Sequence, residues 1–170
     1  GLIQATKDSR GEIVIGTAVA ANNVTFLSKI GNSADATALK LLDIQNANAG
    51  SKVTLVAGSH ITAIKAAGAG KLSIIGDQKI GSIELVQSGQ LGLEIAGHTK
   101  LINAVDLGEV GSTLGKITFA ADKTLTLTDG VNIVASELDT TGANKGTLTF
   151  EGASIFDAAV TGVNTLAAIN

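Results

Sequence analysis

Histidines and recurring carboxylates are the side chains in this sequence that could support acid–base catalysis or metal binding. The 170-residue chain has two histidines, His60 and His98, each in a short polar segment that contains glycine, and it has no cysteine. A metal site needs several nitrogen, sulfur or oxygen ligands at close spacing, such as a Cys-x-x-Cys pair or two nearby histidines. Neither spacing occurs here. We therefore assign no catalytic residue and no metal ligand, and we expect both histidines to lie at matching positions in solvated turns.

Three acids recur in a similar context, each between two apolar residues: Asp43, Glu84 and Asp106. Enzymes that degrade polysaccharides use such carboxylates, in pairs on one face, as general acid and as base or nucleophile. Stacked like charges repel, however, and Lys65 occurs in the same context between Asp43 and Glu84, where it would relieve the repulsion. We interpret these residues as a charge-balanced face whose acids point to solvent. A polysaccharide lyase or hydrolase remains an alternative.

Other motifs match known ligand sites only in part. Residues 111–116 contain glycine and lysine without the spacing of a phosphate-binding loop, and the Gly-Gly-x-Gly-x-Asp repeat of calcium-binding rolls is absent. The Thr-x-Thr-x-Thr run at 124–128 forms a row of hydroxyls, but it has no counterpart in register elsewhere, so we attribute it to β-propensity. No cofactor is predicted, and the binding residues remain unknown.

Composition argues against two further classes of function. The net charge is −3, from 12 basic and 15 acidic residues spread along the chain, and aromatic residues make up 2%. A nucleic-acid surface needs clustered lysines and arginines, often with aromatic residues between them, so we expect no nucleic-acid partner. No apolar run approaches the roughly 18 residues of a transmembrane helix, so we expect no membrane span within the chain.

A repeated strand motif must position these side chains. Residues 70–76, Gly-Lys-Leu-Ser-Ile-Ile-Gly, show the motif: a glycine or serine, a spacer, then two apolar residues separated by one residue. The first apolar residues of the repeats are at positions 13, 53, 72, 93, 117 and 148, so successive steps are 40, 19, 21, 24 and 31. These steps cluster near one or two coils of a β-solenoid. We predict that Ile13, Val53, Leu72, Leu93, Ile117 and Leu148 stack on one wall.

The composition of the core supports the same fold. The chain has four phenylalanines and no tryptophan, tyrosine, methionine or proline, so isoleucine, leucine, valine and alanine must fill the interior. Coils stacked at about 4.8 Å suit such side chains, because each inward position then faces a similar residue of the next coil. We predict an all-β, right-handed parallel β-helix of about seven or eight coils, with one domain over residues 1–170. Residues 33–42, which are rich in alanine, predict a short helix or an irregular excursion.

The later coils resemble a known family. Three segments carry the resemblance: Gly-Lys-Ile-Thr-Phe at 115–119, Asn-Lys-Gly-Thr-Leu-Thr-Phe-Glu-Gly at 144–152, and Val-Thr-Gly-Val-Asn-Thr-Leu-Ala-Ala-Ile-Asn at 160–170. They resemble the passenger regions of bacterial autotransporter surface proteins, most closely the rickettsial surface-antigen type similar to outer membrane protein B. The resemblance implies a passenger that a C-terminal β-barrel translocator of the parent protein displays outside the outer membrane. It also implies roles in host-cell adhesion, invasion or surface-layer formation, and it transfers no binding residue.

We therefore expect an extracellular, non-catalytic β-helix segment excised from a longer passenger, located at the bacterial cell surface. Its expected partner is a host-cell surface protein or another copy of the chain. The chain begins with glycine and shows no signal peptide, so we expect the export signal to lie outside these residues. A self-assembling structural solenoid is a further alternative to the adhesive role.

Overall fold

The computed structural model describes residues 3, 10–16, 21, 23–31, 37–45, 48–56, 58–67, 69–86, 91–102, 106–107, 113–160 and 166–170. This part of the chain contains fourteen strands and no helix, and all the strand pairs are parallel. The strands are β1 Arg10–Ile15, β2 Asn23–Phe26, β3 Leu39–Ile44, β4 Lys52–Leu55, β5 His60–Ala66, β6 Lys71–Leu85, β7 Gly92–Leu101, β8 Asp106–Leu107, β9 Leu114–Phe119, β10 Thr124–Leu127, β11 Asn132–Thr140, β12 Thr147–Phe150, β13 Ile155–Val160 and β14 Ala168–Ile169.

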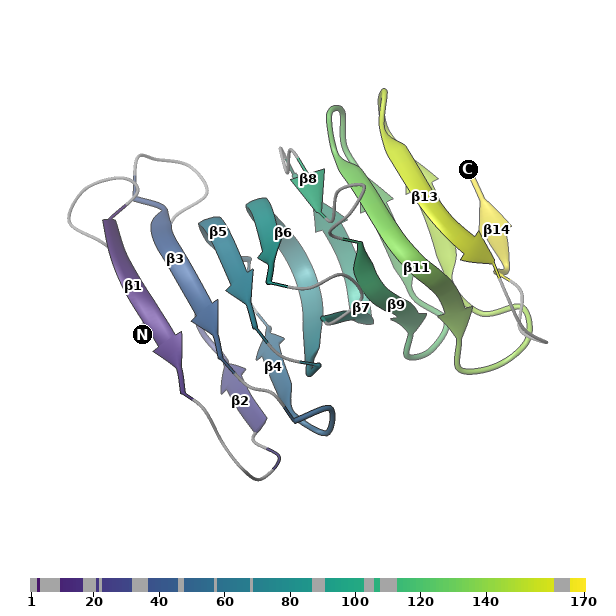
Figure 1. The fold of residues 1–170 in the computed structure, drawn as a ribbon. Helices are drawn as coiled ribbons and strands as arrows, with labels where there is room; N and C mark the ends of the chain where they lie inside the picture. The colour runs from purple at the N-terminus through teal and green to yellow at the C-terminus, as the bar shows by residue number, and fades with distance from the viewer. Residues whose placement is uncertain are drawn as a thin grey trace.

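The strands stack along one axis in three rows, which we call the first, second and third walls of a solenoid (Figure 1). The first wall consists of β1, β3, β5, residues 79–85 of β6, β8, the start of β11, and β13. The second wall consists of β2, β4, the starts of β6 and β7, β9, and the end of β11. The third wall consists of residues 76–78 of β6, residues 99–101 of β7, β10, β12 and β14. The long strands β6, β7 and β11 therefore pass from one wall to another.

The structure confirms the predicted all-β parallel solenoid, but it has about five turns instead of seven or eight. The first step along the first wall, from Ile13 to its partner Leu42, takes 29 residues, which is more than the coil length that the prediction assumed. On the third wall, the first described pairing is only an isolated bridge between Ile3 and Ile30. Long connections and incomplete end windings therefore reduce the number of turns that the chain length allows.

Apolar side chains stack inside the solenoid, rung upon rung. The aligned column on the second wall consists of Val24, Val53, Leu72, Leu93, Ile117 and Leu138. The prediction of a single stack is thus confirmed for its four central members. It is wrong for Ile13, which lies on the first wall, and for Leu148, which lies on the third. All three walls use the same apolar alternation, so the motif marks a strand without showing its wall.

The expected helix or irregular excursion at residues 33–42 is wrong for residues 39–42, while residues 37 and 38 belong to no strand or helix. Residues 39–42 belong to β3, and residues 33–36 lie outside the described residues. Leu39 and Leu42 align with Ile61 and Ile64 of β5 and are buried in the first wall. Apolar residues three apart therefore face the core from a strand here, because burial against the next rung outweighs local helix propensity.

Gln78 is a polar side chain at an inward position of the third wall. Gln78 aligns with Leu101 and, one rung further, with Leu127, and it is fully buried. Its Oε1 accepts a hydrogen bond from the backbone N–H of Ser59 at 3.1 Å, and its Nε2 donates to the carbonyl of Ile75 at 2.7 Å. The amide of Gln78 thus completes the hydrogen bonding at a rung where residues 58 and 59 form no strand.

Candidate functional site

The two histidines do not occupy matching turns. His60 is the first residue of β5 and aligns with Lys79, whereas His98 lies within β7. His98 is exposed, and its Nδ1 accepts a hydrogen bond from the backbone N–H of Thr124 at 3.3 Å. The prediction of two equivalent turns is therefore wrong. Among the described residues, no three histidine, cysteine, aspartate or glutamate side chains lie close enough together to hold a metal ion.

The predicted row of alternating charges on the first wall is present only in part. Asp43, Lys65 and Glu84 align on neighbouring strands, as expected. Asp106 does not continue this row, because it pairs with Ser82, two residues before Glu84. The carboxylates that the sequence placed together therefore do not form one ladder.

Asp43 also differs in its exposure. We expected all these acids to point to solvent, but Asp43 is only 6% exposed. Its Oδ2 accepts a hydrogen bond from Gln45 Nε2 at 2.6 Å, and its Oδ1 has no hydrogen-bond partner among the described residues. A buried carboxylate oxygen without a partner is a source of instability.

The threonine run has a counterpart that we did not expect. Thr124 pairs with Thr147 and Thr126 with Thr149, which gives an array of four half-buried threonines on two rungs of the third wall. The neighbouring rungs break the array, since Thr126 faces Lys100 on the preceding strand. In the glycine- and lysine-containing segment at 111–116, residues 111 and 112 lie outside the described residues, and the chain continues into β9 instead of a helix.

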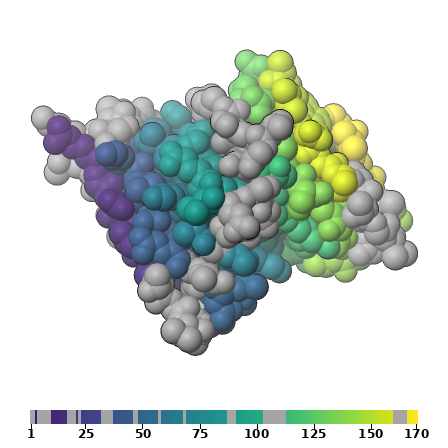
Figure 2. Space-filling model, viewed as in Figure 1, coloured from purple at the N-terminus to yellow at the C-terminus, as the bar shows by residue number. Residues whose placement is uncertain are grey.

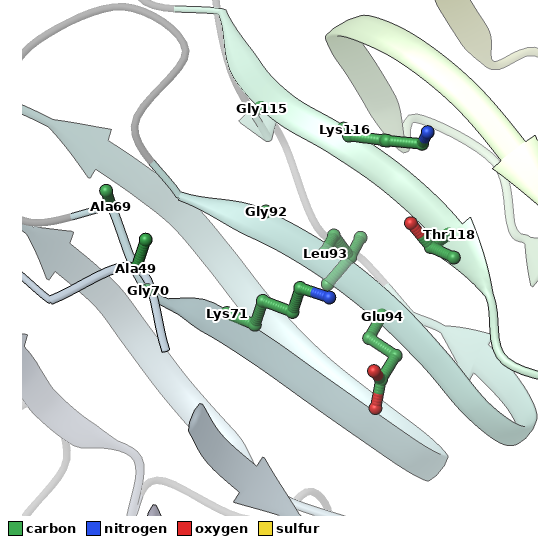
Figure 3. Close-up of a pocket in the computed structure, with 10 residues that line it drawn as sticks. All are labelled: Ala49, Ala69, Gly70, Lys71, Gly92, Leu93, Glu94, Gly115, Lys116 and Thr118. Carbon is green, nitrogen blue, oxygen red and sulfur yellow. The ribbon is translucent and has the colours of Figure 1, made fainter. Parts of the chain in front are cut away.

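A candidate binding site is a depression of about 260 Å³ on the second wall (Figure 3). It is lined by Ala49, Ala69, Gly70, Lys71, Gly92, Leu93, Glu94, Gly115, Lys116 and Thr118. Gly92 is the partner of Lys71 in the outward row of this wall, and Lys116 immediately precedes the partner of Leu93. The absence of a side chain at Gly92 lowers the surface between the two lysines. A Cβ atom there would lie 3.3 Å from the carbonyl oxygen of Lys116.

Glu94 is the acidic member of this depression. Its Oε1 accepts a hydrogen bond from Ser73 Oγ at 2.9 Å and lies 3.1 Å from Lys52 Nζ. Burial raises the pKa of Glu94, but the hydrogen bonds from Ser73 and Lys52 and the charges of Lys52 and Lys71 outweigh burial and hold that pKa below its ordinary value. Glu94 is therefore ionised at neutral pH and poorly suited to act as a general acid.

Lys116 lies on the opposite side of Gly92 from Lys71. Its Nζ is 2.5 Å from Asp139 Oδ2 and 3.4 Å from Glu137 Oε1. The hydrogen bond to Asp139 is the main reason why the pKa of Lys116 is raised, with a smaller contribution from Glu137. A lysine that acts as a general base needs a lowered pKa, so this arrangement favours an ion pair over proton transfer.

Lys71 is the cation of the depression that remains available to a partner. It is exposed, and no carboxylate among the described residues lies within ion-pair distance of its Nζ. Figure 3 shows its amine extending over the strand that carries Gly92 and Leu93. The site thus presents one solvated ammonium group beside a small concave surface, and it can attract an acidic group of a partner.

The sequence carries a signal for the outward row of the second wall. Each residue that directly precedes an aligned apolar residue of this wall points outward, because side chains alternate along a strand. These residues are Lys52, Lys71, Gly92 and Lys116. The row continues to Glu137, which precedes Leu138. Leu138 is followed two residues later by Thr140 instead of a second apolar residue, so the strand motif does not mark it.

Comparison with known proteins found no match among protein-family models, curated proteins or solved structures. The described part of the chain contains no helix with the length and apolarity needed to cross a membrane. The parallel strand topology places this protein in the class of β-solenoids.

Proposed function

We propose that this chain is a non-catalytic segment of the extracellular passenger of a bacterial outer-membrane autotransporter, acting in host-cell adhesion or invasion or in a protective surface layer. The resemblance of its later coils to rickettsial surface antigens supports this proposal, and a parallel solenoid suits such a role. The observation that carries the proposal is the pattern of charges on the second wall. Its three lysines Lys52, Lys71 and Lys116 stand among Glu94, Glu137 and Asp139, so the wall is charge-balanced. Such a surface is suited to contact and poorly suited to acid–base chemistry.

Within this proposal, Lys71 and the depression beside it form the contact with an acidic group on the host-cell surface. Lys52 and Lys116 are already engaged by carboxylates of the same wall, whereas Lys71 is exposed. An exposed charge at the edge of an interface acts mainly on the rate of association and on its salt dependence. We therefore expect binding to host cells to weaken as ionic strength rises.

Binding of the labelled chain to host cells tests the proposal, with recovery of the bound proteins by pull-down. A chain with scrambled turn sequences is the negative control. Lys71→Glu should reduce binding, while Lys40→Glu, which makes the same charge change at an exposed lysine of the first wall, should bind like the original chain. Recovery of the same proteins by the chain and by the scrambled control would contradict specific adhesion. Equal loss in both lysine variants would indicate an effect of net charge alone.

The cluster of Lys116, Glu137 and Asp139 is the observation that favours the alternative of a polysaccharide-active enzyme, since it places two carboxylates beside a lysine. Both carboxylates contact the lysine, and neither lines the depression. Incubation with acidic polysaccharides, followed by assays for unsaturated products and for new reducing ends, tests this alternative. We expect no product. Activity that is lost in Asp139→Asn would contradict the non-catalytic proposal and support the enzyme.

A further inference from the structure

A groove on the third wall is formed by two depressions that adjoin at Asp77. The larger measures about 400 Å³. Its lining consists of Lys29, Gly58, Gly76, Asp77, Lys79 and Ile102. The smaller measures about 260 Å³ and extends past Asp77 to His98, Thr124 and Thr126. Sites for small molecules measure about 300–1,000 Å³. The two depressions together therefore have room for a ligand of several rings.

Strand register and one glycine shape the floor of this groove. Asp77, its partner Lys100 and the next partner Thr126 point outward from three successive rungs. Gly58 lies directly beside Asp77 on the preceding rung, where a Cβ atom would be 2.7 Å from the carbonyl oxygen of Asp77. A residue with a side chain cannot replace Gly58 without moving this backbone. The surface therefore stays low beside Asp77.

The smaller depression lies among coils that this chain itself provides on both sides. Figure 2 shows the coils following one another along the molecule, from purple to yellow, with the teal residues of the middle coils between them. β7 and β10, which carry His98 and the two threonines, are paired on both edges, β7 with β6 and β10, and β10 with β7 and β12. A ligand here therefore contacts outward side chains and cannot add to these strands as a new strand.

The charged side chains of the larger depression are not paired with one another. Lys29 and Asp77 are exposed, and Lys79 is half-buried. Within the described part of the chain, none of the three has an ion-pair partner, whereas Lys100 pairs with Glu151. Two lysines and one aspartate give the depression a net charge of +1. Charge complementarity therefore favours a ligand with a single negative charge.

The lining of the groove favours hydroxyl groups on the uncharged part of this ligand. The carboxylate of Asp77 can accept hydrogen bonds from hydroxyls, and the side chains of Thr124 and Thr126 can both donate and accept them. Ile102 is the one aliphatic side chain among the described residues that line the two depressions. A peptide that cannot add as a strand binds mainly through apolar anchors in hydrophobic pockets. The polar lining therefore favours a sugar over a peptide.

We propose that the third wall binds an oligosaccharide with one acidic sugar. The acid lies beside Lys29 and Lys79, and the adjoining neutral sugars lie over Asp77 and Thr126. The acid is a carboxylate or a sulfate ester, since both present oxygens to the ammonium group of a lysine. This site is separate from the depression beside Lys71, and the inference does not depend on the proposed function.

Sialyllactose tests the proposal, because this trisaccharide has a single carboxylate on its terminal sugar. Lactose is the control without the acid, a tripeptide of the same net charge is the control without the sugar, and a lactose sulfate ester distinguishes the two acids. The variants are Lys79→Gln and Thr126→Val, with Lys71→Gln as the matched control at an exposed lysine of the second wall. NMR titration of the isotopically labelled chain measures Kd. Circular dichroism and thermal unfolding check the fold of each variant.

We expect the original chain to bind sialyllactose or the sulfate ester more tightly than lactose. Lys79→Gln should weaken this binding about tenfold, the lower end of the range for hydrogen bonds to charged groups, and Lys71→Gln should leave it unchanged. Thr126→Val should weaken binding of sialyllactose but not of its free acidic sugar. The proposal is overturned if neither acidic sugar binds, if the tripeptide binds equally well, or if Lys79→Gln binds like the original chain. A loss in Lys71→Gln alone would place the ligand on the second wall and overturn it as well.

Discussion

Lys52 Nζ and Glu94 Oε1 lie 3.1 Å apart, although 42 residues separate them in the sequence. Lys52 belongs to β4 and Glu94 to β7, and β6 runs between these strands on the second wall. Ser73 of β6 donates a hydrogen bond to the same carboxylate oxygen. One carboxylate therefore connects three successive rungs. The side chains of Lys52 and Glu94 are 41% and 16% exposed, so solvent screening limits the contribution of the ion pair to less than about 1 kcal/mol.

Glu94 should make stability depend on pH in the acid range. Its folded-state pKa lies below the ordinary value of 4.5, so its contribution is present above pH 4.5 and is lost as the pH falls through the folded-state pKa. We predict that Glu94→Gln removes this part of the acid destabilisation. Urea unfolding at a series of pH values measures it. Glu84→Gln, at an exposed acid of the first wall, is the control, and an equal flattening in that variant would contradict the prediction.

Replacing Gln78 by leucine should lower stability, although leucine occupies the equivalent positions of the next rungs. The next rungs have leucine at this position, yet Gln78→Leu would leave the backbone N–H of Ser59 and the carbonyl of Ile75 without these hydrogen bonds. A buried unsatisfied polar group costs about 1–3 kcal/mol. We predict a loss of stability in this range, measured by chemical unfolding. Leu101→Met, a change of similar volume in the same column, should cost less than about 1.5 kcal/mol, and a smaller effect for Gln78→Leu than for this control would contradict the prediction.

The repeat period made the fold class predictable, because a core of aliphatic residues with steps near 20 fits few other architectures. The assignment of strands to walls was not predictable in full. Leu148 carries the same motif as Leu93, but it lies on the third wall. Every wall needs one inward residue at alternate positions, so the local pattern of all three walls is the same.

The candidate site was less predictable than the fold for the same reason. Lys71, Gly92 and Lys116 become neighbours only through the register of three rungs, and Asp139 joins Lys116 through a fourth. The strand motif relates Lys71, Gly92 and Lys116, because each precedes an aligned apolar residue, but it does not mark the strand end that carries Asp139. The buried environment of Asp43 was also not visible, since its neighbours in the sequence predict an outward position and say nothing about what covers it.

Substitutions at two glycines with positive φ distinguish the energetic cost of backbone conformation from the cost of steric overlap. Gly130 has φ +78°, and a Cβ atom there would meet nothing within 4 Å. Gly146 has φ +75°, and its Cβ would lie 2.5 Å from Cγ of Phe119, which is fully buried. We predict that Gly130→Ala costs about 1–2 kcal/mol. Gly146→Ala should cost about 1–3 kcal/mol more, because it also forces the phenylalanine to move. Equal losses in thermal unfolding would contradict the packing argument.

Position along the stack should decide the cost of truncating a core residue. Leu125 is fully buried and Ile169 is 65% exposed, although both belong to one inward column of the third wall. We predict a loss of about 2–5 kcal/mol for Leu125→Ala and less than about 1 kcal/mol for Ile169→Ala. The measurement is urea unfolding at a protein concentration low enough to keep the chain monomeric. A large effect at Ile169 under these conditions would mean that residues of the same chain cover the C-terminal end.

Asp43 offers a substitution that should increase stability. The side chain is 6% exposed. The described residues offer no hydrogen-bond partner to its Oδ1 and place no cation within ion-pair distance of it, Lys65 on the adjacent strand included. Asp43→Asn keeps the shape and one oxygen that can accept the hydrogen bond from Gln45, but it removes a buried charge. We predict a gain of about 1 kcal/mol in the free energy of unfolding at neutral pH, since an uncompensated buried charge is costly.

The control for this prediction is Asp157→Asn, which removes an equal charge from an exposed position on the first wall. It should change the free energy of unfolding by less than about 0.5 kcal/mol. If Asp43→Asn instead lowers stability, the carboxylate must be stabilised in the folded chain by a cation or a donor. The buried carboxylate of Asp43 would then stabilise the first wall.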